Sequence, residues 1–284
     1  MVILERDTFP GFHIGESLLA SVNDVLDAIG AAHLVRESSF PQKWGATFMT
    51  PDGRVERFAD FAVSSEVPRP QTWQVPRDQF DELLLRHAAA CGAEVREQHR
   101  VVDIAFDPDG VSVTYRAGLD GGTVSIDAAQ DEVGTADARL RARAVVDASG
   151  RASLLSRRFN LRLHEPALAN IAIFSHYAGV PRGEGRRSGD IRVVARADAG
   201  WFWLIPISGD LMSVGAVLPR AVFQAQPKLD HPELLKRLIA ETPAVARLMR
   251  QATRRWPVRV ERDFSVEKVL PLYRSLFEGL VKRA

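Results

Sequence analysis

Lys43 is the one lysine of the segment FPQKWGATF, residues 40–48, and its neighbours there are aromatic or small. The segment contains no acidic residue that would pair with the ammonium group. A lysine removed from water has a lowered pKa and becomes a usable amine nucleophile or a directed hydrogen-bond donor. Phe40, Trp44 and Phe48 provide the kind of apolar surround that protects an electrophile from water. The alternative is a surface lysine whose stem packs on Trp44 while its ammonium reaches solvent.

Two tryptophans alternate in the segment GWFWLIPI, which contains the pattern Trp-x-Trp-x-Ile-Pro as Trp201, Trp203, Ile205 and Pro206. Alternate residues of a β-strand lie on one face, so both indoles are expected on the same side. Taken alone, the pattern is typical of an aromatic strand packed in a hydrophobic core. It gains a functional interpretation only in combination with other segments.

Three segments have, in order along the chain, the features of a nucleotide-binding unit. The run MVILE ends in Glu5, and a carboxylate at a strand end can bond both ribose hydroxyls of an adenosine. Arg77 opens a helix just after a strand, and the strand AVVDASG ends in a tight turn from Asp147 to Gly150. Each segment alone has a structural explanation, as an ion pair or a loop. Their order resembles that of the FAD-binding domain of flavoprotein hydroxylases, and this resemblance implies binding of FAD.

The composition is that of an ordinary globular protein, with 46% hydrophobic and 26% charged residues in a chain of 284. The net charge of +1 gives no general argument for a nucleic-acid or membrane partner. A single cysteine, Cys91, excludes an internal disulfide and a thiolate metal site and suits a reducing compartment. No apolar run reaches the roughly 18 residues of a transmembrane helix. We therefore expect a cytoplasmic protein with no metal, nucleic-acid or membrane partner.

The pattern of secondary structure changes near residue 165. Before it, a turn at Gly15-Glu16-Ser17 is expected to open one helix, and a second helix is expected between Pro76 and Gly92. A hairpin is expected around residues 108–110, and residues 140–150 are expected to form a strand that ends in a small-residue turn. After residue 165, consecutive apolar segments predict antiparallel strands.

This switch predicts an α/β fold, in which an incomplete, Rossmann-like parallel sheet is interleaved with an antiparallel substrate-domain sheet. We expect residues 1–38, 75–104 and 138–160 to form an FAD-binding domain. Residues 39–74 and 161–265 are expected to form the substrate domain, and residues 266–284 a C-terminal helix.

The sequence resembles the flavin-dependent halogenases, a family within the FAD-dependent monooxygenases. The stretches LERDTFPGFHIGESLL, FPQKWGATF and GWFWLIPI carry the resemblance, and the Trp-x-Trp-x-Ile-Pro pattern is its most specific motif. In this family, reduced FAD and oxygen convert chloride or bromide into hypohalous acid, which travels through a tunnel to a lysine beside an electron-rich aromatic substrate. The resemblance implies FAD supplied in reduced form by a flavin reductase, a halide ion, and an aromatic substrate that is free or tethered to a carrier protein.

The resemblance also implies roles for particular residues. Lys43 would form a haloamine or polarise the hypohalous acid, and the motif would line the passage between the flavin and Lys43 and keep the substrate from the flavin. The implied catalytic residues are Lys43, Trp201, Trp203, Ile205 and Pro206. The implied cofactor-binding residues are Glu5, Gly15, Glu16, Ser17, Arg77, Asp147 and Gly150.

Two elements of the family pattern are not matched. The chain contains no GxGxxG sequence, and its Gly-Asp pairs, Gly189-Asp190 and Gly209-Asp210, do not fit the position of the family's later Gly-Asp segment. Without a glycine loop, the FAD pyrophosphate lacks the amide groups that usually bind it. Two alternatives therefore stay open beside the halogenase: a related FAD-dependent monooxygenase or reductase, and an inactive, truncated remnant.

Overall fold

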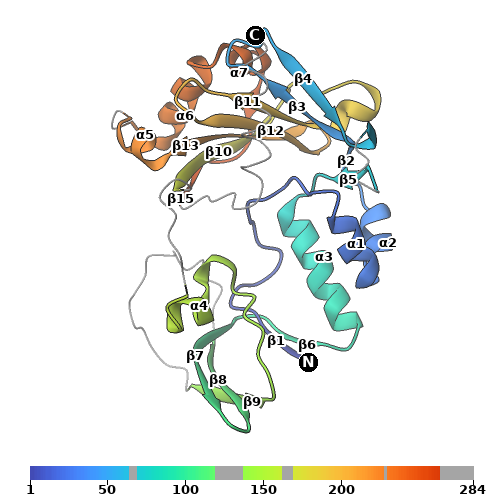
Figure 1. Ribbon diagram of the computed structural model, residues 1–284, viewed down its shortest axis with the longest axis vertical. Coiled ribbons are helices and arrows are strands. Elements are labelled where there is room, and N and C mark those ends of the chain that lie inside the picture. Colours follow the sequence, from blue (N-terminus) through green and yellow to red (C-terminus); the bar gives the residue numbers. More distant parts are fainter. Residues whose placement is uncertain (64–68, 119–136, 162–168, 227–228, 263–284) are drawn as a thin grey trace. The chain divides into compact units, whose positions relative to one another are not determined.

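The computed structural model describes residues 1–63, 69–118, 137–161, 169–226 and 229–262, drawn as ribbons in Figure 1. The chain divides into two compact units. The first unit comprises Met1–His13 and Arg77–His164, and the second comprises Ile14–Pro76 and Glu165–Ala284. The chain thus passes from one unit to the other three times, which fits the predicted interleaving.

A two-stranded parallel sheet in the first unit pairs β1 (Val2–Leu4) with β6 (Glu94–Arg96). The helix α3 (Arg77–Ala90) immediately precedes β6. α3 follows Pro76, which is favourable at a helix start because the first amides lack helical partners anyway. Beyond it, Gly92 has φ +93°, a conformation that stops a helix at little cost in glycine. The predicted strand and helix are both present here.

Three antiparallel strands form the other sheet of the first unit, in the order β7, β8, β9. They span His99–Asp107, Gly110–Ala117 and Ala138–Ala142. The expected hairpin lies between β7 and β8, where Asp107 pairs with Gly110. The strand predicted over 140–150 ends instead at Ala142, because its pairing with β8 stops there. The short helices η2 (Gly150–Ala152) and α4 (Leu154–Arg158) follow.

An eight-stranded mixed sheet dominates the second unit. Its order is β14-β10-β13-β12-β11-β3-β4, and β15 also pairs with β10. All pairs are antiparallel except β3 with β11. The strands are β3 (Gly45–Met49), β4 (Glu56–Asp60), β10 (Asn170–Ala178), β11 (Ile191–Ala195), β12 (Trp201–Ser208), β13 (Leu211–Pro219), β14 (Thr253–Arg254) and β15 (Arg259–Arg262).

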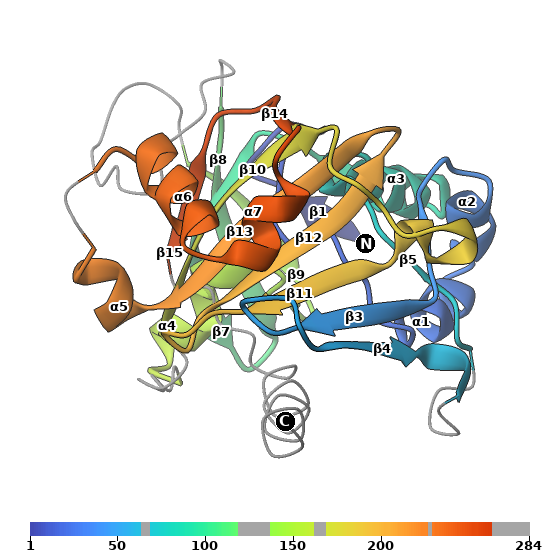
Figure 2. The same cartoon turned by 90° about the horizontal axis from the view of Figure 1, so that it is seen from above.

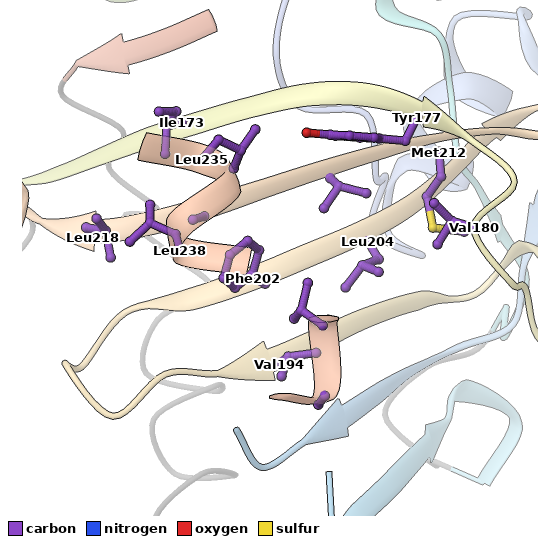
Figure 3. Close-up of a cluster of buried hydrophobic side chains, with 14 of the residues drawn as sticks. Ile173, Tyr177, Val180, Val194, Phe202, Leu204, Met212, Leu218, Leu235 and Leu238 are labelled. Atoms are coloured by element: carbon purple, nitrogen blue, oxygen red, sulfur yellow. The ribbon is translucent and has the colours of Figure 1, made fainter. Parts of the chain in front are cut away.

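Helices α6 (His231–Ala240) and α7 (Pro243–Leu248) cover one face of this sheet, and α5 (Arg220–Gln224) precedes them (Figure 2). Asp230 caps α6 by accepting a hydrogen bond from the Glu233 amide at 2.8 Å. Leu235 and Leu238 of α6 pack into a buried cluster with Phe202 and other apolar side chains of β10 to β13 (Figure 3). This cluster is the core of the second unit, because its members are almost fully excluded from water.

The N-terminal part of the second unit differs from the prediction. The helix expected to open at residues 15–17 begins only at Val22, as α1 (Val22–Ala28), and is followed by α2 (Ala32–Arg36). The physical reason is a competing pairing: Ser17 forms a β-bridge with Gln74, and the Leu18 amide donates to the Trp73 carbonyl at 3.0 Å. Residues 15–21, called the strap below, are therefore not helical.

Small elements complete the second unit. β2 (Gln42–Lys43) pairs with β5 (Thr72–Trp73), and the 3-10 helices η1 and η4 span Phe61–Val63 and Gly185–Gly189. The α/β fold class is confirmed. Residues 14–38, predicted for the cofactor half, lie in the second compact unit, and the functional division into domains stays a prediction. The predicted C-terminal helix over 266–284 lies outside the described residues.

Candidate functional site

Lys43 is buried, with only 3% of its surface exposed. Its Nζ donates hydrogen bonds to Ser17 Oγ and to the Leu18 carbonyl oxygen, both at 2.9 Å. The same nitrogen lies 5.4 Å from the centre of the Phe61 ring. Both hydrogen-bond acceptors come from the strap, so the amine is held in place by neutral oxygens and an aromatic face.

Burial lowers the pKa of Lys43 to about 8, while the negative charge of Asp190 partly opposes that shift. At pH 7 a lysine with this pKa is neutral in about one molecule in ten. The site therefore offers a neutral amine and an ammonium donor in comparable amounts near pH 8. The surface-lysine alternative fails on this point, because the ammonium does not reach solvent.

Two further side chains of the site escaped the sequence analysis. His176, in β10, has Nε2 2.8 Å from Oε1 of Glu16 in the strap, and both side chains are buried. The His176 ring packs against Trp256, with ring centres 4.6 Å apart. Asp190 is also buried, between η4 and β11. The available sequence signal was a histidine inside the mostly apolar segment 170–180 and an aspartate after a glycine, and neither signal identifies the partner residues.

The tryptophan motif lies on β12. Trp203 donates from Nε1 to Ser213 Oγ at 3.0 Å and packs against Phe174, with ring centres 5.8 Å apart. Trp203, Ile205 and Pro206 are buried, and Trp201 is half-buried.

The motif occupies a definite face of the sheet. Phe202 and Leu204 belong to the cluster under α6 and α7, so the alternate residues Trp201, Trp203 and Ile205 lie on the opposite face. His176 lies on that face too, because its neighbour Tyr177 is in the cluster. The structure thus brings Trp201, Trp203, Ile205 and the Glu16–His176 pair to one side of the sheet, whereas Pro206, which pairs with Met212 of the cluster, lies on the other face.

The predicted cofactor residues are split between the two units. Glu5, Arg77, Asp147 and Gly150 belong to the first unit, whereas Gly15, Glu16 and Ser17 belong to the second. Glu16 and Ser17 use their side chains within the second unit, toward His176 and Lys43. Their assignment to cofactor binding stays a prediction.

Glu5 and Arg77 lie at the ends of elements, as expected. Glu5 follows β1 directly, and one of its carboxylate oxygens accepts from the Asp7 amide at 2.9 Å. Arg77 is the first residue of α3 and makes a two-point contact with Asp81, at 2.8 and 2.9 Å. A carboxylate at a strand end suits ribose hydroxyls, and a cation at a helix N-terminus suits a phosphate. The chemistry of these residues fits the adenosine diphosphate part of FAD.

The Asp147–Gly150 turn is organised by Asp147. Its carboxylate accepts from the amide and hydroxyl of Ser149 and from the Leu155 amide. The hydrogen bond from the Ser149 side chain, opposed by partial desolvation, holds the pKa of Asp147 below its usual value. Gly150 has φ +58°, and no atom lies within 4 Å of where its Cβ would be. The turn is therefore open for close approach of a ligand to its backbone.

A surface cavity of about 370 Å³ lies in the second unit. Trp44 and Trp73 form two of its walls, and Asp27, Arg36 and Arg69 lie at its polar side. Trp44 is the residue after Lys43, and Lys43 itself is not among the residues that line this cavity. Among the described residues there is no cluster of metal-ligating side chains and no helix that qualifies as a membrane span.

A family model described as an FAD binding domain matches residues 20–168, more than half of the chain. The chain belongs to the FAD-binding domain family. Among curated members, the flavin-dependent halogenase armH4 of Armillaria mellea is 34% identical over 239 residues, which cover 81% of this chain and 43% of the relative. The 1H-pyrrole-2-carbonyl-[peptidyl-carrier protein] chlorinase of Pseudomonas fluorescens is 30% identical over 76% of this chain and 49% of its own length.

Solved structures of flavin-dependent halogenases have folds similar to the fold of this chain. The flavin-dependent halogenase CmlS has a TM-score of 0.79 at 26% identity, over 92% of this chain and 44% of that chain. The myxobacterial chondrochloren halogenase CndH has a TM-score of 0.73 at 30% identity, over 93% and 58%. The predicted resemblance to flavin-dependent halogenases is confirmed. The chain spans about half the length of the curated relatives that it matches.

Proposed function

We propose that this protein is a flavin-dependent halogenase that chlorinates or brominates an electron-rich aromatic substrate. The observation that carries the proposal is Lys43, a buried lysine whose pKa is lowered to about 8 and whose Nζ is fixed by Ser17 and the Leu18 carbonyl. Such an amine suits an electrophilic halogen, because it is neutral often enough to attack and protonated often enough to donate.

Bound reduced FAD, with oxygen, supplies the oxidant that turns a halide ion into hypohalous acid. We assign binding of the adenosine part of FAD to Glu5 and Arg77. We assign close approach of FAD to the protein backbone to the turn that contains Asp147 and Gly150. The strap would contribute through Gly15, Glu16 and Ser17, the last two with their main chains, because their side chains bind His176 and Lys43.

Lys43 acts on the hypohalous acid in one of two ways. The neutral amine attacks the halogen, so that an N–halogen bond forms, the O–halogen bond breaks, and hydroxide leaves as water with the amine proton. The haloamine then transfers the halogen to a ring carbon, which loses a proton while the bonding pair returns to nitrogen. Alternatively, the ammonium form donates a hydrogen bond to the hypohalous oxygen and polarises its bond to the halogen.

The tryptophan motif has a separate role in this proposal. Trp203 is fixed by Ser213 and Phe174, and Trp201, Ile205 and Pro206 continue the same strand. Trp201, Trp203 and Ile205 would line the passage from the flavin to Lys43 and keep the substrate away from the flavin, while Pro206, on the other face, would support the strand. The proposed partners are a flavin reductase and an aromatic small molecule, either free or carried on a carrier protein, as the name of the pyrrole chlorinase suggests for that relative.

The test uses the purified chain with FAD, a flavin reductase, NADH, oxygen and chloride or bromide, and a panel of phenols, indoles and pyrroles. Wild-type protein should give products in which halogen replaces a ring hydrogen, detected by mass spectrometry. Lys43→Ala should abolish these products, while oxidation of the reduced flavin by oxygen and formation of hypohalous acid continue. Lys236→Ala, at a lysine whose side chain is 76% exposed, is the matched control and should react like wild type. Halide-independent hydroxylation, or halogenation by Lys43→Ala at the wild-type rate, would refute the proposal.

A further inference from the structure

Gly189 and Asp190 form one of the chain's two Gly-Asp pairs, and neither pair fits the family's Gly-Asp position. In the structure, Gly189 ends η4 and Asp190 directly precedes β11. Asp190 is buried, with 6% of its surface exposed. A buried carboxylate is costly unless it is paired or hydrogen-bonded, so its surroundings need an explanation.

Asp190 binds the chain immediately after Lys43. Its Oδ1 accepts hydrogen bonds from the amides of Trp44, at 2.7 Å, and Gly45, at 2.9 Å. These amides lie at the corner where the chain passes from β2 into β3, and Asp190 is 145 residues away in sequence from Gly45. One carboxylate oxygen therefore fixes the backbone on the C-terminal side of Lys43.

Gly189 binds the chain immediately before Lys43. A Cβ at position 189 would lie 2.0 Å from the Gln42 carbonyl oxygen, so only glycine admits this approach. The Gly189 carbonyl in turn accepts from Nε2 of buried Gln74 at 2.9 Å. The Gly-Asp pair thus contacts the residues on both sides of Lys43.

Carboxylates on the strap and on β4 have side-chain partners of their own. Glu16 is paired with His176, and Asp60, opposite Gly45 in the sheet, is paired with Arg186. Arg187 of η4 pairs with Glu56. Asp190 is the group whose negative charge opposes the fall in the pKa of Lys43 caused by burial, and its second oxygen, Oδ2, is buried with no hydrogen-bond partner among the described residues. The charge of Asp190 is therefore the one that acts on the Lys43 amine.

We propose that the Gly189-Asp190 pair is the positioning element of Lys43: glycine lets the backbone before the lysine approach, and the carboxylate fixes the backbone after it and keeps part of the charge on the amine. The proposal rests on the proposed catalytic role of Lys43. It makes Asp190 a positioning residue and assigns it no contact with substrate. The direction of the effect of Asp190 on the pKa of Lys43 agrees with this role.

The test measures the pKa of Lys43 directly. The sequence contains five lysines, Lys43, Lys228, Lys236, Lys268 and Lys282, so ¹³Cε-labelled lysine gives few resonances, and Lys43→Met assigns the one of interest. Asp190→Asn keeps the oxygen that accepts from Trp44 and Gly45 but removes the charge. The titration midpoint of Lys43 should therefore fall below the wild-type midpoint. Asp60→Asn, which removes a paired carboxylate on the other side of Gly45, is the matched control and should leave it unchanged.

A Lys43 midpoint that is the same in Asp190→Asn and wild type would overturn the proposal. If Asp190→Asn does not fold, a second variant supplies the measurement. The Trp44 and Gly45 amide resonances and the Lys43 ¹³Cε titration are then compared between wild type and Asp190→Glu, which keeps the charge but displaces the carboxylate; unchanged amide resonances together with an unchanged Lys43 midpoint would also refute the proposal. Neither measurement uses halide, flavin or substrate, so a failed halogenation assay leaves this result intact.

Discussion

His176 and Glu16 lie 160 residues apart in sequence, yet His176 Nε2 is 2.8 Å from Glu16 Oε1 and both side chains are buried. This contact fastens the strap to β10, on the sheet face that also carries Trp203. Ser17, the next residue of the strap, accepts a hydrogen bond from Lys43. The Glu16–His176 pair therefore supports the Lys43 site from a distant strand.

Removing one partner of this pair should be strongly destabilising. In His176→Phe the Glu16 carboxylate would stay buried without its partner, which typically costs about 3–5 kcal/mol of unfolding free energy. Urea unfolding followed by circular dichroism measures the loss, and His33→Phe, at an exposed histidine, is the control. The double variant Glu16→Leu/His176→Phe should regain much of the stability, because replacing both buried groups removes the orphaned charge. A double variant as unstable as the single one would contradict this explanation.

Lys43 should make the stability of the protein depend on pH in the alkaline range. Its pKa is about 8 in the folded protein, against 10.5 for a fully solvated lysine, so folding disfavours the protonated form by about 3 kcal/mol. Between these two pKa values the unfolded chain binds more protons, and the stability contributed by this group rises with pH. We expect Lys43→Met to be more stable than wild type at pH 7, although it loses two hydrogen bonds. This advantage should shrink as pH rises from 8 to 10.5, and urea titrations at fixed pH values that show a constant difference would disprove it.

Trp203 depends on a glycine of the neighbouring strand. A Cβ at Gly215 would lie 2.3 Å from the Trp203 ring and 2.6 Å from Phe174 Cβ. Gly215→Ala should therefore displace the indole and destabilise the protein by about 1–3 kcal/mol, the usual cost of overpacking a core. Loss of the near-ultraviolet circular dichroism of tryptophan is the specific readout. Gly11→Ala, where the backbone is not left-handed and a Cβ would lie at an ordinary 3.6 Å from the Thr8 carbonyl oxygen, is the control for general loss of glycine; an unchanged tryptophan spectrum in Gly215→Ala would show that the contact is relieved elsewhere.

The Asp147 turn should control FAD affinity under the proposed function. Asp147→Ala removes the acceptor for the Ser149 and Leu155 hydrogen bonds, so the turn loses its fixed shape. We expect several-fold weaker binding of FAD, measured by fluorescence titration. Asp103→Ala, at an exposed aspartate whose partner is Arg158, should bind FAD like wild type. Equal affinity of the Asp147 variant and wild type would remove this turn from the cofactor site.

Local signals in the sequence determined several elements of this protein. The run before Glu5, the helix after Pro76 and the hairpin at Gly110 all formed as their residues predict. Each is set by periodicity or turn chemistry within about 10 to 20 residues, so neighbouring residues suffice to specify it. The tryptophan motif likewise lies on a strand, with its indoles on the face that alternation predicts.

Tertiary structure alone decided the surroundings of Lys43. The strap has helix-forming residues, but Ser17 and Leu18 pair with Gln74 and Trp73, so the helix begins later. The contacts of Lys43 with Ser17, of Asp190 with Trp44, and of His176 with Glu16 join segments that are distant in sequence. Which polar side chains meet at a buried site follows from strand order and register, and a single sequence contains no local signal for either.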